Sequence, residues 1–154
     1  MCGIIAIARQ KSSRIPPSAE GIKQSAGLSN LGRIQDHQDI LRCVKKLQKV
    51  KELISGAAGI NTLISDSQFR SYLQGICSIL TEDLENYESE LVQTGMDSQN
   101  LEEINTDLIK LKDLLWHIEY DRIIVSQSVG ELLGGRTGDR FIAVSYTHLR
   151  AHET

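Results

Sequence analysis

The sequence predicts a mostly helical protein with a single β-strand at its N-terminus. Only 5% of the 154 residues are aromatic, and Leu, Ile, Lys and Glu are frequent, which favours helices over a β-sandwich or barrel. Long apolar stripes recur at intervals of three and four residues, the period of an amphipathic helix. The length suits one domain with a sizeable core and is too short for two domains of ordinary size.

The expected strand is the stretch "GIIAIAR", residues 3–9. It is rich in β-branched side chains and has few polar positions, which is typical of a strand buried on both faces. The two prolines and the serines of "QKSSRIPPSAE" then break the pattern, and a helix should begin near Ser18. Residues 11–35 are therefore interpreted as a linker with a weak helix.

Three helices are expected between residues 36 and 135, each with one apolar stripe and each followed by a glycine (Gly56, Gly95 and Gly134) that can end it. "SGAAGINTLISD" is interpreted as a break, Ser98 as a cap and Arg122 as an interruption of the third stripe. Such helices should pack antiparallel as a hairpin or bundle. The stripes are Cys43, Leu47, Val50 and Ile54; Phe69, Leu73, Ile76, Leu80, Leu84, Tyr87 and Leu91; and Leu101, Ile104, Leu108, Leu111, Leu115, Ile118, Val125, Val129 and Leu132.

Charge and cysteine content narrow the class of protein. The net charge is -3 and the charges are interspersed, so neither a nucleic-acid nor a membrane partner is expected. The three cysteines are widely spaced, which fits a reducing cytoplasm better than a disulfide framework. The apolar run at residues 4–8 is too short for a signal peptide or a membrane span. His148 and His152 lack a third ligand, so no metal or cofactor is expected.

Cys2 is the one residue whose position suggests catalysis. Removal of Met1 would leave Cys2 with both a thiol and a free α-amine. The amine, with a pKa of about 7.7–8.0, can accept the proton of the thiol, whose pKa is about 8.5. Nucleophile and base then share one residue. Gly3 keeps the neighbouring backbone open to a substrate. Cys2 is the candidate catalytic residue, with Gly3 beside it.

The start "MCGI", continuing as an apolar strand, resembles the class II glutamine amidotransferases, whose nucleophile is an N-terminal cysteine. Within that class the stretches "MCGIIAIARQ", "LISGAAGINTLISD" and "LKDLLWHIEYDRIIVSQSVGELLGG" look most like an isomerising glutamine–fructose-6-phosphate aminotransferase with a helical insertion. The resemblance implies an α+β, four-layer N-terminal-nucleophile hydrolase domain. It also implies hydrolysis of glutamine and transfer of ammonia to fructose 6-phosphate, which gives glucosamine 6-phosphate.

Several parts of that family's pattern have no counterpart here. The sequence has no "RGxDSAG" segment, no arginine-containing glutamine clamp and no Asn-Gly oxyanion pair, so only Cys2 is carried over as catalytic. The final eleven residues, "VSYTHLRAHET", resemble a translated sequencing-adapter tail. The chain is thus interpreted as an N-terminal fragment, inactive alone. The expected parts are a first strand at 1–10, the linker at 11–35, a helical insertion at 36–135, the returning glutaminase domain at 136–143 and a non-native tail at 144–154.

Two other functions remain open. The chain could be a non-enzymatic helical interaction module whose heptads pair with a partner or with a second copy, which would make it a homo-oligomer. It could also belong to another class II amidotransferase, such as an asparagine synthetase or a glutamate synthase. His117 lies in "WHIEYD", but Glu119 and Asp121 fall on different sides of a helix, which indicates a solvated face rather than an acid–base site.

Overall fold

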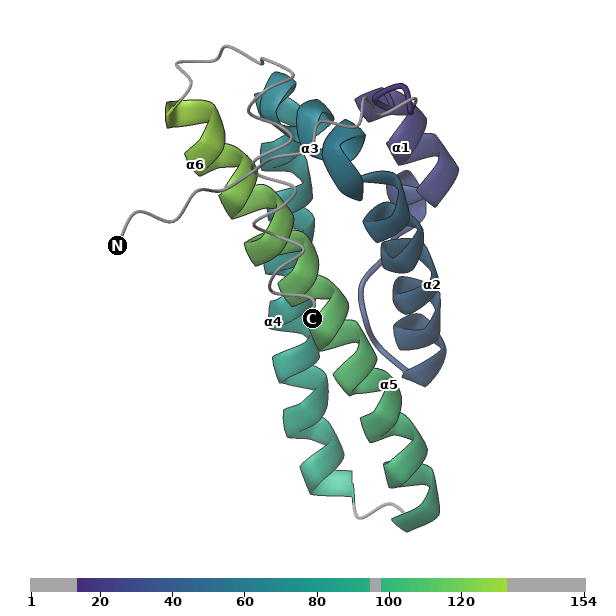
Figure 1. The fold of residues 1–154 in the computed structure, drawn as a ribbon. Helices are drawn as coiled ribbons and strands as arrows, with labels where there is room; N and C mark the ends of the chain where they lie inside the picture. Colours follow the sequence, from purple (N-terminus) through teal and green to yellow (C-terminus); the bar gives the residue numbers. More distant parts are fainter. Residues whose placement is uncertain (1–13, 95–97, 133–154) are drawn as a thin grey trace, which may run out of the picture.

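The computed structural model describes residues 14–94 and 98–132, and Figure 1 shows them as an elongated bundle of helices. The elements, in chain order, are α1 (Ala19–Ala26), the 3-10 helix η1 (Leu28–Asn30), α2 (His37–Leu53), α3 (Gly56–Ser65), α4 (Ser67–Thr94), α5 (Ser98–Trp116), the π-helix η2 (His117–Ile124) and α6 (Val125–Leu132).

The structure contradicts the predicted fold class, except for its mostly helical content. A mostly α chain was expected and is found, but the expected α+β class, an incomplete four-layer hydrolase domain, is wrong, because the described residues form helices and no strand. Their apolar positions follow a helical period, which cannot line one face of a sheet. The predicted strand at 3–9, with Cys2 and Gly3, lies outside the described residues. So do 136–143 and the tail at 144–154.

Two long rods form the frame of the bundle. Figure 1 shows α4 and the continuous α5–η2–α6 rod running in opposite directions. Helix α2 packs mainly against α5, α1 packs on α2, and α3 crosses between α4 and α6. The helices predicted from the stripes at 69–91 and 101–132 are therefore present, and the stripe residues between Phe69 and Leu91 and between Ile104 and Ile118 lie in the core or against it.

One hydrophobic core joins nearly all of these elements. Leu47 of α2, Leu80 of α4 and Leu111 of α5 are each at most 1% exposed. The core also includes residues from the stretch expected to be a linker, namely Ile22, Ala26, Leu28, Leu31 and Ile34.

Ser18 caps α1 by accepting a hydrogen bond from the Gly21 amide at 3.0 Å, and Gly27 ends that helix in the left-handed region, at φ 60°. The start near Ser18 is thus confirmed, and this helix belongs to the bundle.

Helix α3 replaces the break expected at residues 55–66. The glycines at 56 and 59 led to the prediction of a break, but the backbone geometry requires a glycine at each position. Gly56 has φ 68°, a conformation that turns the chain sharply out of α2 and that L side chains avoid. A Cβ on Gly59 would overlap the backbone of Ile54. The missing side chain therefore lets α3 sit directly against the end of α2, with Ile60 and Leu63 buried.

The third predicted helix continues past Arg122, although its apolar stripe is interrupted there. Residues 117–124 widen into a π-helix, which adds a residue to the turn. As a result Arg122 (7% exposed) and Ile123 (0%) both face inward. The interruption in the apolar spacing marks a change of helix type, and the rod continues to Leu132.

Polar contacts fix how α2 and the loop before it meet the two rods. Arg33 donates to both carboxylate oxygens of Asp83 at 2.8 and 2.9 Å. His37 Nε2 lies 3.0 Å from Asp107 Oδ2, and Lys110 Nζ lies 2.9 Å from Asp107 Oδ1. The hydrogen bonds from Lys110 and then His37 hold the pKa of Asp107 below its usual value. This buried carboxylate thus joins α2 to α5 in its ionised form.

Gly59→Ala should destabilise the protein, because the new methyl group meets backbone that cannot move aside without displacing α3. Overpacking of this kind costs about 1–3 kcal/mol. Gly75→Ala is the matched control, since Gly75 lies inside α4 with no atom within 4 Å of its Cβ position, and it should gain up to about 1 kcal/mol in helix propensity. Urea unfolding of both variants measures the difference. Equal stabilities would contradict the close approach of α3 to Ile54.

Asp107→Asn should remove an acid-sensitive part of the stability. A carboxylate with a lowered pKa stabilises the fold above its unfolded pKa, near 3.9, and this contribution is lost as the pH falls through the lower folded value. Unfolding free energy measured from pH 6 downward should therefore fall less steeply in Asp107→Asn. Asp113→Asn, an exposed site on α5, serves as the control. An acid slope unchanged by Asp107→Asn would show that this carboxylate does not carry the effect.

Candidate functional site

The predicted nucleophile Cys2 and its neighbour Gly3 lie outside the described residues, so the structure begins with the segment that follows them. Arg14 opens this segment and binds the C-terminus of α2. Its guanidinium donates to the carbonyl oxygens of Leu53 at 2.8 Å, Ser55 at 3.2 Å and Glu52 at 3.3 Å. The last carbonyls of a helix lack partners within the helix and carry the negative end of its dipole. Arg14 therefore anchors the chain that leads back toward Cys2.

Helix α3 holds the first and last described segments together. Thr62 donates its hydroxyl hydrogen bond to the Pro17 carbonyl at 2.7 Å. On its other side, Ile60 and Ile64 form a small buried cluster with Val129 of α6. Figure 1 shows the end of α6 at the same end of the bundle as α1 and α3. The chain thus enters and leaves the bundle beside one helix. No local sequence signal pointed to the contacts of Arg14 and Thr62.

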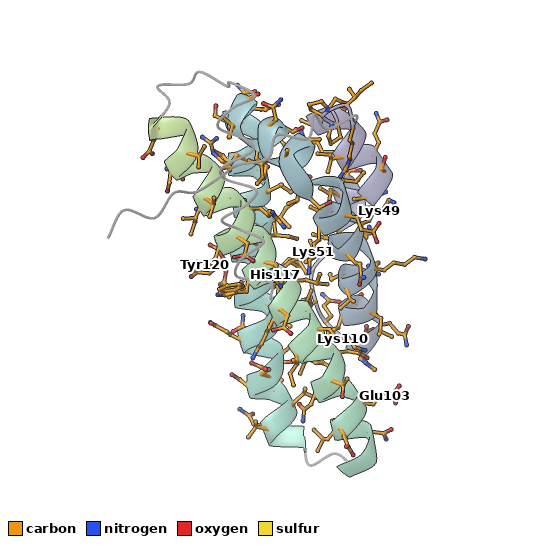
Figure 2. The ribbon with its side chains drawn as sticks, in the orientation of Figure 1. Lys49, Lys51, Glu103, Lys110, His117 and Tyr120 are labelled. Atoms are coloured by element: carbon orange, nitrogen blue, oxygen red, sulfur yellow. The ribbon has the colours of Figure 1, made fainter. Side chains whose placement is uncertain are left out.

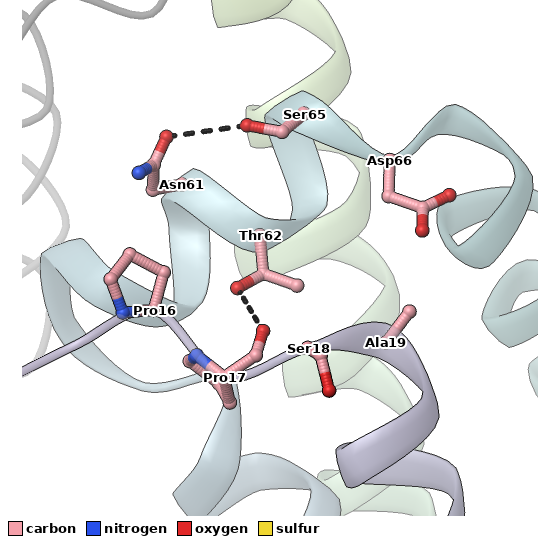
Figure 3. A pocket seen from close by; sticks show the side chains of 8 residues that line it. All are labelled: Pro16, Pro17, Ser18, Ala19, Asn61, Thr62, Ser65 and Asp66. Carbon is pink, nitrogen blue, oxygen red and sulfur yellow. Dashed lines mark hydrogen bonds between the residues drawn. The ribbon is translucent and has the colours of Figure 1, made fainter.

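A shallow depression of about 300 Å³ opens between the segment before α1 and the end of α3. Figure 3 shows the side chains that line it: Pro16, Pro17, Ser18, Ala19, Asn61, Thr62, Ser65 and Asp66. Its polar groups already serve the fold. Ser65 donates to Asn61 at 3.4 Å, and Asp66 accepts from the Phe69 amide at 2.8 Å at the start of α4. The lining offers hydroxyls, the Asn61 amide and one capping carboxylate, an arrangement suited to joining helices.

The two described cysteines lie in the core. Cys43 of α2 is 0% exposed and Cys77 of α4 is 1% exposed. Cys43 belongs to the first predicted apolar stripe, and Cys77 directly follows Ile76 of the second. Burial raises the pKa of Cys43 to about 11 and that of Cys77 to about 12. Since the thiolate is the reactive form, both thiols are poor nucleophiles near neutral pH.

Two exposed aromatic side chains lie at the start of the π-helix. Trp116 (53% exposed) and Tyr120 (49%) stack with ring centroids 5.7 Å apart. Beside them, His117 Nδ1 lies 2.6 Å from Asp121 Oδ2. Figure 2 labels His117 and Tyr120 on this rod. The sequence placed these residues on a solvated face but missed the His117–Asp121 pair, which the spacing of four residues could have indicated.

Metal-binding clusters and membrane-spanning helices are both absent from the described part of the chain. Within residues 14–94 and 98–132, no three His, Cys, Asp or Glu side chains lie together in a way that could hold a metal ion. His148 and His152 fall outside these ranges. None of the helices described there is both long enough and apolar enough to span a membrane.

Cys43 and Cys77 should resist thiol reagents until the protein unfolds. In a Cys2→Ala chain, the raised pKa values and the burial should slow their reaction with an aromatic disulfide more than about 100-fold relative to a free thiol at pH 7. Absorbance of the released thiol, with and without 8 M urea, measures this. Rapid reaction of either cysteine under native conditions would be incompatible with the packing of α2 or α4.

Comparison with known proteins adds no relative. No protein-family profile, no curated protein and no solved structure matches this chain.

Proposed function

We propose that Cys2 is the nucleophile of a class II glutamine amidotransferase and that the helical bundle is a non-catalytic insertion in that enzyme. The observation that carries this proposal is the cysteine that directly follows Met1, in "MCGI". The burial of Cys43 and Cys77 supports it, because neither of those thiols is placed to react with a substrate. A cytoplasmic location belongs to the same proposal.

In the proposed reaction, Cys2 supplies both the nucleophile and the base. After removal of Met1, the α-amine of Cys2 takes the proton of the thiol, and the thiolate attacks the side-chain carboxamide carbon of glutamine. The bond from that carbon to nitrogen breaks, and the nitrogen leaves with a proton from the α-ammonium as ammonia. Water then hydrolyses the thioester to glutamate. In the isomerising enzymes that the sequence resembles, the ammonia reacts with fructose 6-phosphate and the product is glucosamine 6-phosphate.

The geometry of the bundle suits an insertion. A domain inserted into another is tolerated best where its two ends lie close together at the surface. Here Pro17, near the first described residue, and Val129, near the last, both contact α3. The bundle can therefore sit on a host domain without separating the segments on either side of it.

The decisive experiment labels the nucleophile in the complete gene product that carries this chain. A glutamine analogue with an electrophilic ketone should alkylate Cys2, identified by peptide mapping. Cys2→Ala should abolish glutamine-dependent synthesis while ammonia-dependent synthesis at the sugar site survives, because only the attack on the carboxamide is lost. Cys43→Ala is the matched control and should still be labelled at Cys2.

Label found on Cys43, or glutamine hydrolysis that survives Cys2→Ala, would overturn the proposal. The 154-residue chain alone should release no ammonia from glutamine. Its sequence contains no counterpart of the family's clamp or oxyanion pair, and one missing oxyanion donor already costs about 10²–10³-fold in rate. Synthesis with fructose 6-phosphate as the acceptor would separate the isomerising enzymes from asparagine synthetases and glutamate synthases, which share the nucleophile.

A helical interaction module is the second candidate. It is favoured by a specific observation, the exposed aromatic pair Trp116 and Tyr120 on the outer face of the third predicted helix. A module of this kind needs no Cys2 chemistry, so the labelling experiment separates it from the enzyme.

A further inference from the structure

We infer that the outer face of α5 and η2 is the contact surface of an antiparallel dimer of this chain. Four apolar residues form what we call the outer stripe: Ile109 (60% exposed), Trp116 (53%), Tyr120 (49%) and Ile124 (39%). This inference identifies a partner for the second candidate function, and it does not depend on the chemistry of Cys2.

The outer stripe lies opposite the face that α5 buries in the core. The inner face carries Leu108, Leu111 and Leu115, each at most 4% exposed. The outer residues follow at spacings of seven, four and four, and the wide turn of the π-helix keeps residues four apart nearly in line. At about 1.5 Å per residue, the stripe is roughly 22 Å long. That length suits one helix of a partner.

The aromatic pair is suited to the centre of such a contact. Trp116 and Tyr120 are held against each other by stacking at an interplanar angle of 22°, so little side-chain freedom remains to be lost on binding. Large aromatic residues near the centre of an interface often supply most of its binding energy. A solvent-exposed stacked pair of this size is therefore a strong candidate for a buried contact.

Charged residues flank the stripe on both sides, and their order indicates which partner fits. On the side of α4, Lys112 (bonded to Glu88) is followed seven residues later by Glu119. On the side of α2, Lys110 (bonded to Asp107) is followed eleven residues later by Asp121. Between residues 110 and 121 each flank thus runs from a positive charge toward a negative one, with His117 paired to Asp121. The exposed Asp113 lies between Ile109 and Trp116 on the stripe itself.

A second copy placed antiparallel satisfies both flanks at once. In an antiparallel helix pair, residues on the same flank face each other. When Lys112 of one copy lies opposite Glu119 of the other, Lys110 lies opposite Asp121. In the same register the two Trp116 side chains meet near the two-fold axis, and Ile109 lies level with the space between Tyr120 and Ile124 of the other copy. A parallel pair would instead place like charges at the same level.

The charges set orientation and register, while the apolar stripe supplies the affinity. Exposed ion pairs contribute about 0–1 kcal/mol each, and the bonds of Lys112 and Lys110 within the chain can be shared with a partner. Because both copies use the same patch, the assembly closes as a two-fold dimer and does not extend into a filament.

The test measures association of the full 154-residue chain by sedimentation equilibrium. A small contact of this type is expected to give a monomer at about 1 µM and a dimer at about 100 µM. Trp116 is the only tryptophan of the chain, so its fluorescence reports on the stripe alone. Its emission should shift to shorter wavelength over the same concentration range.

Variants separate the stripe from other exposed apolar residues. Ile109→Asp and Trp116→Ala should each weaken association at least about 30-fold. Val92→Asp is the matched control, because Val92 is 86% exposed on α4, away from the stripe, and it should leave the dimer intact. Circular dichroism melts confirm that each variant is folded before its mass is compared.

Charge reversal tests the register. Lys112→Glu and Glu119→Lys should each weaken the dimer, and the double variant should regain most of the affinity. The carboxylate introduced by Lys112→Glu would still face Glu88 within its own chain, so this recovery cannot come from repair of the monomer. A chain that stays monomeric at about 100 µM, or a dimer that survives Ile109→Asp and Trp116→Ala, would overturn the inference. A double variant no tighter than the singles would overturn the antiparallel register.

Discussion

The fold depends on the burial of α5 between α2 and α4. Leu108, Leu111 and Leu115 present one apolar face, and it is shared by two helices that contact each other little, so α5 holds the bundle together. Helix α1 packs mainly on α2, and Arg33 of the loop before α2 binds Asp83 of α4. Loss of α5 would leave the apolar faces of α2 and α4 without a common partner. Such a core makes the bundle cooperative, since no pair of helices can bury its stripe alone.

Polar contacts then select one arrangement of the helices from those that the apolar stripes allow. The bidentate contact of Arg33 with Asp83 and the contact of Asp107 with His37 each join an element near the start of the chain to one of the long rods. Each involves a buried carboxylate, which is costly to leave without a partner. A sliding of α2 along α5 by one turn would separate His37 from Asp107, so the register of the helices is fixed by charge as well as by packing.

The sequence predicted the long helices well because their stripes extend over many turns. It predicted α3 poorly, since the glycines at 56 and 59 lower helix propensity, while their actual role, a sharp turn and a close approach to Ile54, depends on where α2 ends. The contacts of Arg14 and of His37 join residues far apart in sequence and leave no local pattern. The burial of Cys43 and Cys77 agrees with the helical periodicity, whereas the proposed catalytic role of Cys2 rests on its place after Met1 and on a resemblance alone.

The π-helix at residues 117–124 changes which side of the α5–η2–α6 rod its apolar residues occupy. Below it, α5 turns its apolar face to α2 and α4, and above it α6 turns Val129 toward Ile60 and Ile64 of α3. The extra residue supplies the rotation that lets one straight rod serve both clusters. Deletion of a single residue there would restore an ordinary α-helix and rotate α6 by about 100° relative to α5. Length in this stretch is therefore under a stricter constraint than residue identity, and an insertion or deletion would separate α6 from α3 while leaving α5 in place.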